Sequence, residues 1–81
     1  MTDALAWIHE FAVAAGGAPL TDEERESILA LAGVAAHSSE RIAAPLTCWV
    51  AAAAGLSPVA ALQIAQQLAE SLGDGEQELD Q

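Results

Sequence analysis

From Ile42 to Ala69 the chain carries no charged residue. A membrane span needs roughly 20 consecutive apolar residues, so this run must first be tested as one. Gly55, Ser57 and Pro58 interrupt the run near its middle, and neither half reaches that length. The run therefore predicts two helices of a soluble protein, one on each side of the interruption.

The composition favours helices throughout the 81 residues. Much of the 53% apolar content is alanine, which has the best intrinsic helix propensity. Residues that favour strands are scarce and never alternate over a useful stretch. Few bulky side chains are available for a core. Those expected to form it are Leu5, Trp7, Ile8, Phe11, Ile28, Leu29, Leu31, Leu46, Trp49, Val50, Leu62, Ile64, Leu68 and Leu72.

The first two helices have clear end signals. Thr2 or Asp3 can cap a helix over residues 3–15, whose apolar side chains share one wide face. Paired glycines directly after it can take the left-handed conformation that ends a helix. Thr21 and Glu24 have the spacing of a capping box, so a second helix begins there. It is predicted to end near residue 37.

The third helix is predicted from Pro45 to Ala54, with Gly55 as its C-terminal cap. It carries no charge on any side. A helix that is apolar all round lies either at the centre of its fold or against a partner. One stripe of this helix holds Leu46, Trp49, Val50 and Ala53.

The fourth helix is predicted to begin with Ser57 as N-cap and Pro58 as its first residue, and to close at Gly73. Residues 1–73 then form a single helical domain. Residues 74–81 form an acidic tail whose composition predicts flexibility unless it is bound.

Four helices joined by short loops predict an all-α fold. The expected architecture is a compact four-helix bundle or an orthogonal helical array with the uncharged third helix at its centre. Because the connections are short, helices that follow one another are expected to pack antiparallel.

The net charge of −10 restricts the partners. Such an acidic surface repels phosphate backbones and anionic lipids, so neither nucleic-acid binding nor membrane insertion is expected. A protein partner should be basic where the two meet. A lone cysteine and the lack of a signal-peptide pattern favour a cytoplasmic location.

No catalytic or metal-binding constellation is recognised. His9-Glu10 begins a zinc-protease pattern, but Val13 stands where the second histidine belongs. Cys48 near a helix start could have a lowered pKa, with His37 as the nearest conceivable base, yet unpaired cysteines are more often small buried side chains. The sequence therefore predicts a protein that is not an enzyme and holds no metal or cofactor.

The densest polar cluster adjoins the uncharged third helix, in residues 37–47. This segment could bind a protein partner, or the helix N-terminus could hold an anion such as a phosphate. It could also be an ordinary loop in which Arg41 pairs with a neighbouring acid. Trp7, Phe11 and Trp49 are expected in the core, although part of one could serve as a docking surface, for example in a homodimer. The candidate binding residues are His37, Glu40, Arg41, Pro45, Thr47 and Trp49.

Residues 28–55 resemble a small actinobacterial family of unknown function. The resemblance lies in Ala36-His37, Glu40-Arg41, the motif at residues 43–47 and the alanines closed by glycine at 51–55. Ile42 departs from the family's pattern, which has proline there. Members occur alone or fused to molybdenum cofactor guanylyltransferases, which attach GMP to molybdopterin. The resemblance implies a non-catalytic accessory protein that binds a molybdenum cofactor enzyme. A carrier of a phosphate-bearing cofactor is the alternative.

Overall fold

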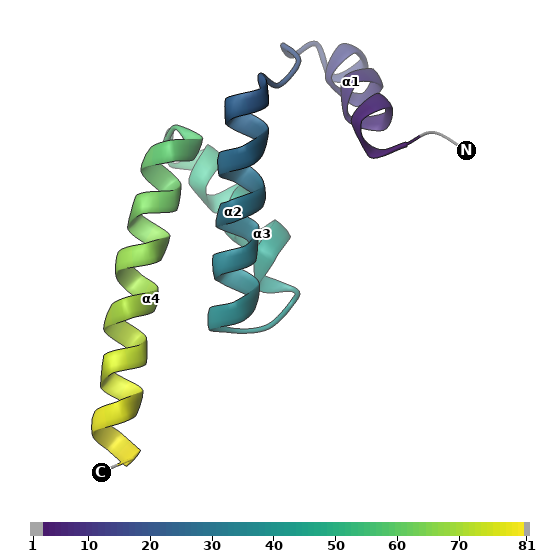
Figure 1. Ribbon diagram of the computed structural model, residues 1–81. Coiled ribbons are helices and arrows are strands. Elements are labelled where there is room, and N and C mark those ends of the chain that lie inside the picture. Colours follow the sequence, from purple (N-terminus) through teal and green to yellow (C-terminus); the bar gives the residue numbers. More distant parts are fainter. Residues whose placement is uncertain (1–2, 81) are drawn as a thin grey trace.

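The structure is a computed structural model that describes residues 3–80, with side chains described for residues 3–72. It contains four helices and, within residues 3–80, no strand (Figure 1). The predicted all-α fold is therefore confirmed. The helices are α1 (Ala4–Ala15), α2 (Asp22–Ser38), α3 (Ala43–Ala53) and α4 (Pro58–Asp80).

The ends of α1 follow the sequence signals. The Asp3 carboxylate accepts a hydrogen bond from the backbone N–H of Ala6 at 2.8 Å, as an N-cap does. At the other end Gly16 has φ of 79°, a left-handed conformation that glycine adopts without strain. The short connection to α2 starts from this turn, so Gly16 sets the direction in which α1 leaves the rest of the chain.

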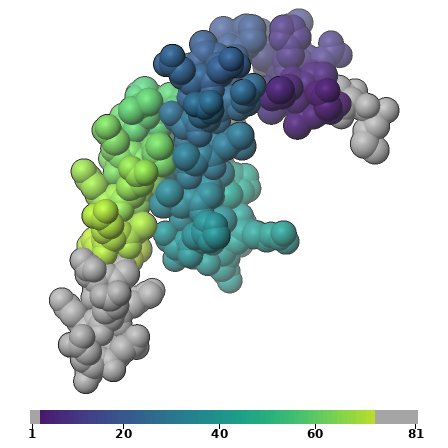
Figure 2. Space-filling model, viewed as in Figure 1, coloured from purple at the N-terminus to yellow at the C-terminus, as the bar shows by residue number. Residues whose placement is uncertain are grey.

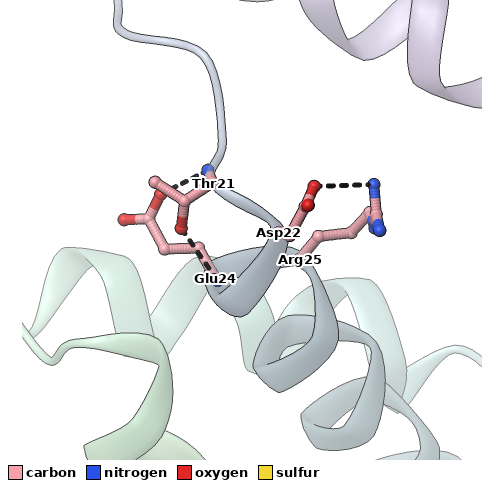
Figure 3. Close-up of polar contacts among 4 residues, drawn as sticks. All are labelled: Thr21, Asp22, Glu24 and Arg25. Carbon is pink, nitrogen blue, oxygen red and sulfur yellow. Dashed lines mark hydrogen bonds and ion pairs between the residues drawn. The ribbon is translucent and has the colours of Figure 1, made fainter.

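The capping box of α2 is formed as predicted (Figure 3). The Thr21 hydroxyl accepts a hydrogen bond from the N–H of Glu24 at 3.1 Å, and the Glu24 carboxylate accepts one from the N–H of Thr21 at 2.9 Å. Asp22 forms an ion pair with Arg25 one turn later, at 3.5 Å. These local contacts fix the start of the helix that carries most of the tertiary packing.

Helix α3 begins at Ala43, two residues before the predicted start at Pro45. The N–H of Ala43 donates to the carbonyl of Glu40, and the N–H of Ala44 to that of Arg41, so a tight turn leads into the helix. Pro45 then lies within the first turn, where a missing N–H removes no helical hydrogen bond.

Helix α4 begins as predicted, because the Ser57 hydroxyl accepts from the N–H of Ala60 at 3.2 Å. Its predicted end at Gly73 is wrong, since the helix continues to Asp80. A glycine costs a helix only about 1 kcal/mol relative to alanine, which does not by itself end it. The side chains of the tail, residues 74–81, lie outside the described ones. The flexibility predicted for this tail therefore stays a prediction. Among the described residues, no helix combines the length and apolarity of a membrane span.

Helix α2 lies between α3 and α4 and packs against both, whereas α3 and α4 approach each other only slightly. The chain runs along α2, returns antiparallel along α3 and turns again, so α4 lies beside α2 and points the same way (Figure 1). The predicted central place of the third helix is therefore not found, because α2 takes it.

Helix α1 stands apart from this three-helix layer. Within the described part of the chain, none of its Cα atoms comes within 8 Å of a Cα atom in another helix. Figure 2 shows α1 at one end of the molecule, beyond the start of α2. Its apolar face is consequently not used for packing against the other three helices.

Few side chains are fully buried as a result. Among residues 3–72 only Leu31, at 2% exposure, and Ala61, at 4%, are buried. The expected core was therefore overestimated, because α1 does not join the layer and the bulky side of α3 faces away from it. Of the side chains expected in that core, those more than 36% exposed are Leu5, Trp7, Ile8, Phe11, Leu29, Leu46, Trp49, Val50, Ile64, Leu68 and Leu72.

Candidate functional site

Helix α3 turns its small side chains toward α2 and its bulky ones toward solvent. Thr47, Cys48 and Ala51 are half-buried on the inner side. Small side chains let two helix axes approach closely, so this side gives the tighter contact with α2. We call the outward row the α3 stripe. It consists of Ile42, Leu46, Trp49 and Ala53.

The α3 stripe is continuous and strongly exposed. Its members follow at intervals of four, three and four residues, which places them on one side of a helix. Ile42 is 66% exposed, Leu46 62% and Trp49 76%. A contiguous row of large apolar side chains on a surface marks an interaction site more often than scattered ones do. The stripe is therefore the leading candidate for a docking surface.

Five of the six predicted site residues lie exposed around this stripe. His37 is in the last turn of α2, and Glu40 and Arg41 are in the connection to α3. Pro45 and Trp49 are one turn apart on the outward side of α3. These residues could contact one partner together.

Thr47 lies elsewhere. It is half-buried on the opposite side of α3 and lines a groove with α4 residues such as Ala65 and Leu68. The sequence placed it in the site because it is close along the chain, but the helical turn carries it to the other face.

Among residues 3–72, Arg41 has no charged partner. The ion pair between Arg25 and Asp22 is the only one among residues 3–72. The alternative in which Arg41 pairs with Glu40 is therefore not formed. Arg41 is exposed beside the start of the α3 stripe. Its guanidinium is therefore available to a carboxylate of a partner.

The N-terminus of α3 does not offer the free backbone donors expected for an anion site. The N–H groups of Ala43 and Ala44 donate to backbone carbonyls at 2.9 and 3.1 Å, and Pro45 has no N–H. No side chain caps this terminus. No observation in the structure thus favours a phosphate-binding function over protein docking.

The environment of Cys48 differs from the one a reactive thiol needs. Burial on the side of α3 facing α2 raises the pKa of its thiol, whereas the sequence suggested that the helix start would lower it. Its surroundings include the apolar side chains of Ile28 and Leu31. Cys48 is therefore a packing residue. Among the described residues, no three histidine, cysteine or acidic side chains come together as metal ligands.

This raised pKa predicts a pH effect on stability. The folded protein disfavours the thiolate, so the neutral Cys48 thiol contributes to the free energy of unfolding. This contribution is fully present below the pKa of an unfolded cysteine, about 8.5, and is lost as the pH rises through the folded-state pKa. The melting temperature of the wild type should therefore fall more steeply above about pH 8.5 than that of Cys48→Ala. Parallel pH profiles for the two proteins would contradict this assignment.

The sequence interpretation did not predict that Ile42 and Leu46 are surface residues. Ile42 was noted only as a departure from a proline, and Leu46 was assigned to the core. The helical spacing from Ile42 to Ala53 was visible in the sequence, but periodicity alone does not say whether an apolar row faces a core or a partner.

A family model described as a domain of unknown function, DUF6457, matches residues 1–79. It covers nearly the whole chain, whereas the sequence resemblance was stated for residues 28–55. No curated protein and no solved structure matches the chain.

Proposed function

The chain belongs to the DUF6457 family, and we propose that it is a non-catalytic accessory protein that docks onto a protein partner through the α3 stripe. The exposure of Trp49, at 76%, is the observation that carries this proposal. A tryptophan left in water keeps a large apolar surface unburied, and tryptophan is among the commonest energetic anchors at protein interfaces.

Polar groups at one end of the stripe would orient a bound partner along α3. Arg41 and His37 are exposed near the start of α3, where Arg41 has no charged partner among residues 3–72. An interface with an apolar centre and a polar rim is the usual arrangement for a stable complex. An acidic group of the partner facing Arg41 would fix the register along α3, while the chain's net charge of −10 favours a partner that is otherwise basic.

The proposed partner is an enzyme of molybdenum cofactor maturation or a molybdoenzyme. Support for this part comes from the resemblance of residues 28–55 to a family whose members are also fused to molybdenum cofactor guanylyltransferases. Fusion places two domains that act together on one chain. The segment that carries the resemblance, residues 28–55, includes Arg41 and the whole α3 stripe, although Ile42 departs from the family's pattern.

Capture of the partner from native lysate tests the docking surface. Trp49→Ala and Arg41→Glu should each lower recovery of the partner at least about tenfold, the usual effect of removing an interface anchor. Leu29→Ala is the matched control, because it removes a side chain that is 63% exposed on α2, outside the stripe. Circular dichroism should show equal helicity in all four proteins. Unchanged recovery in both α3 variants would exclude this surface.

The identity of the captured protein tests the molybdenum part separately. Mass spectrometry should find an enzyme that makes, carries or uses the molybdenum cofactor. A stripe-dependent partner without any such role would remove the molybdenum assignment and leave the docking surface intact.

A further inference from the structure

Helices α3 and α4 diverge over α2 and leave an apolar groove between them. The floor is formed by α2 and the walls by the facing sides of α3 and α4. Two adjoining pockets of about 160 and 150 Å³ make up this groove, and they share Thr47, Ala65 and Leu68 as lining residues. We call it the α3–α4 groove.

Each pocket has room for one aromatic ring. A cavity of about 150 Å³ lined by aliphatic side chains is large enough to bind benzene. The walls offer the same kind of surface, including Val50, Ile64 and Leu68, each at least half exposed. The groove is thus shaped and lined for two neighbouring aromatic side chains.

Helix α1 carries such a pair. Trp7 and Phe11 lie one turn apart with ring centroids 6.4 Å apart, and each is 61% exposed. No residue of α1 is buried, and among the described residues no Cα atom of α1 comes within 8 Å of a Cα atom in another helix. The same chain therefore contains an unfilled groove for two rings and an unpacked helix that presents two rings.

We propose that α1 of one chain inserts Trp7 and Phe11 into the α3–α4 groove of a second copy, and that the second copy does the same in return. The product is a two-fold symmetric dimer in which each groove receives the fourth helix that its own layer lacks. This surface is separate from the α3 stripe, so the dimer leaves Trp49 free for the docking proposed above.

The chain exposes more surface than a globular monomer of its mass does. A globular monomer of 8.3 kDa exposes roughly 4,600 Å², whereas this chain exposes 6355 Å². The excess is about 1,800 Å² per chain, or about 3,600 Å² for two chains. Obligate homodimers bury about 2,000–5,000 Å² in total.

Charge also favours a second copy over a basic partner in this groove. All the pocket-lining residues are uncharged, and of the twelve acids in the chain only Asp3 and Glu10 lie on α1 or at its cap. A basic partner finds no acid to pair with on the groove walls, whereas the apolar face of α1 needs none.

The connection between α1 and α2 leaves α1 apart from the three-helix layer of its own chain. The N–H of Gly17 donates to the carbonyl of Ala12 at 2.9 Å, which fixes the turn after α1. Pro19 and Leu20 of the connection line a pocket with Leu5 and Ile8 of α1 and with Arg25 of α2. Helix α1 lies beyond the start of α2 (Figure 2). Trp7 and Phe11 are each 61% exposed.

Sedimentation equilibrium of the full chain tests the proposal. The wild type should have twice the monomer mass of 8.3 kDa. Phe11→Glu should raise the dissociation constant at least about a hundredfold, because two inserted rings are lost per dimer. Val13→Glu is the matched control: it adds the same charge to the same helix at a position 64% exposed on the other side, and should leave the dimer intact.

A second variant tests the groove itself. Ala65 lines both pockets, so Ala65→Phe should fill the groove from within and give a helical monomer. A wild-type monomer would overturn the proposal, including one whose tryptophan fluorescence shows α1 buried in its own groove. A dimer that survives both Phe11→Glu and Ala65→Phe would also overturn it, since another surface would then hold the chains together.

Discussion

Leu31→Ala is expected to lower the free energy of unfolding by about 3 kcal/mol, because removing a buried leucine loses its burial and leaves a cavity. Leu31 is 2% exposed and lines two pockets together with residues of α3 and α4, so it lies where the three helices meet. A protein of this size is stabilised by roughly 4–12 kcal/mol in total, and the variant would therefore lose a large share. Urea unfolding followed by circular dichroism measures the loss.

The control for this prediction lies two residues earlier. Leu29 is on the same helix and 63% exposed, so Leu29→Ala should change stability by no more than about 0.5 kcal/mol. All proteins must be compared at one chain concentration, because dimerisation would add to apparent stability. Equal losses in the two variants would mean that α2 is not the centre of the core.

Ala61→Glu is expected to unfold most of the protein at neutral pH. Ala61 is 4% exposed, and α4 packs against α2 more extensively than any other helix pair packs. A glutamate there places an unpaired carboxylate in an apolar contact and forces the helices apart, which together should cost at least about 4 kcal/mol. The helical circular dichroism signal should be lost at neutral pH without added denaturant.

The pH dependence identifies the cause of that loss. Burial raises the pKa of an introduced carboxyl group, so part of the stability should return as the pH falls toward the ordinary glutamate value of about 4.3. Gln63→Glu adds the same charge to an exposed position of α4 and should stay folded at neutral pH. If Ala61→Glu is as stable as Gln63→Glu, the contact between α2 and α4 is looser than described.

The helix starts were predictable because short-range contacts fix them. The cap at Asp3, the capping box at Thr21 and Glu24, and the Ser57 cap each involve residues at most three positions apart. Such contacts depend little on the rest of the fold. The start of α3 was misplaced because its turn is stabilised by backbone hydrogen bonds, which leave no side-chain signal.

The candidate site was predicted in part. The segment around Arg41 was found because polar residues beside an uncharged helix are visible in sequence, and five of the six named residues are exposed. Thr47 was named by proximity along the chain and lies on another face of α3 than the stripe, whereas Ile42 of the stripe was not among the named residues. To tell the outward residues of α3 from the inward ones, one must know which side of α3 packs against α2. A helix that is apolar on all sides has no polar face that would indicate this.

The amino-acid sequence alone determined that this chain is helical, where most of its helices begin and that they would be short of bulky core residues, since propensity and capping act within a few residues. Tertiary structure alone decided that α2 is central, that the bulky row of α3 faces outward and that α1 joins no other helix. The physical reason is that alanine-rich helices can pack on several sides with similar energy. The choice among those sides depends on how the whole set of helices fits together.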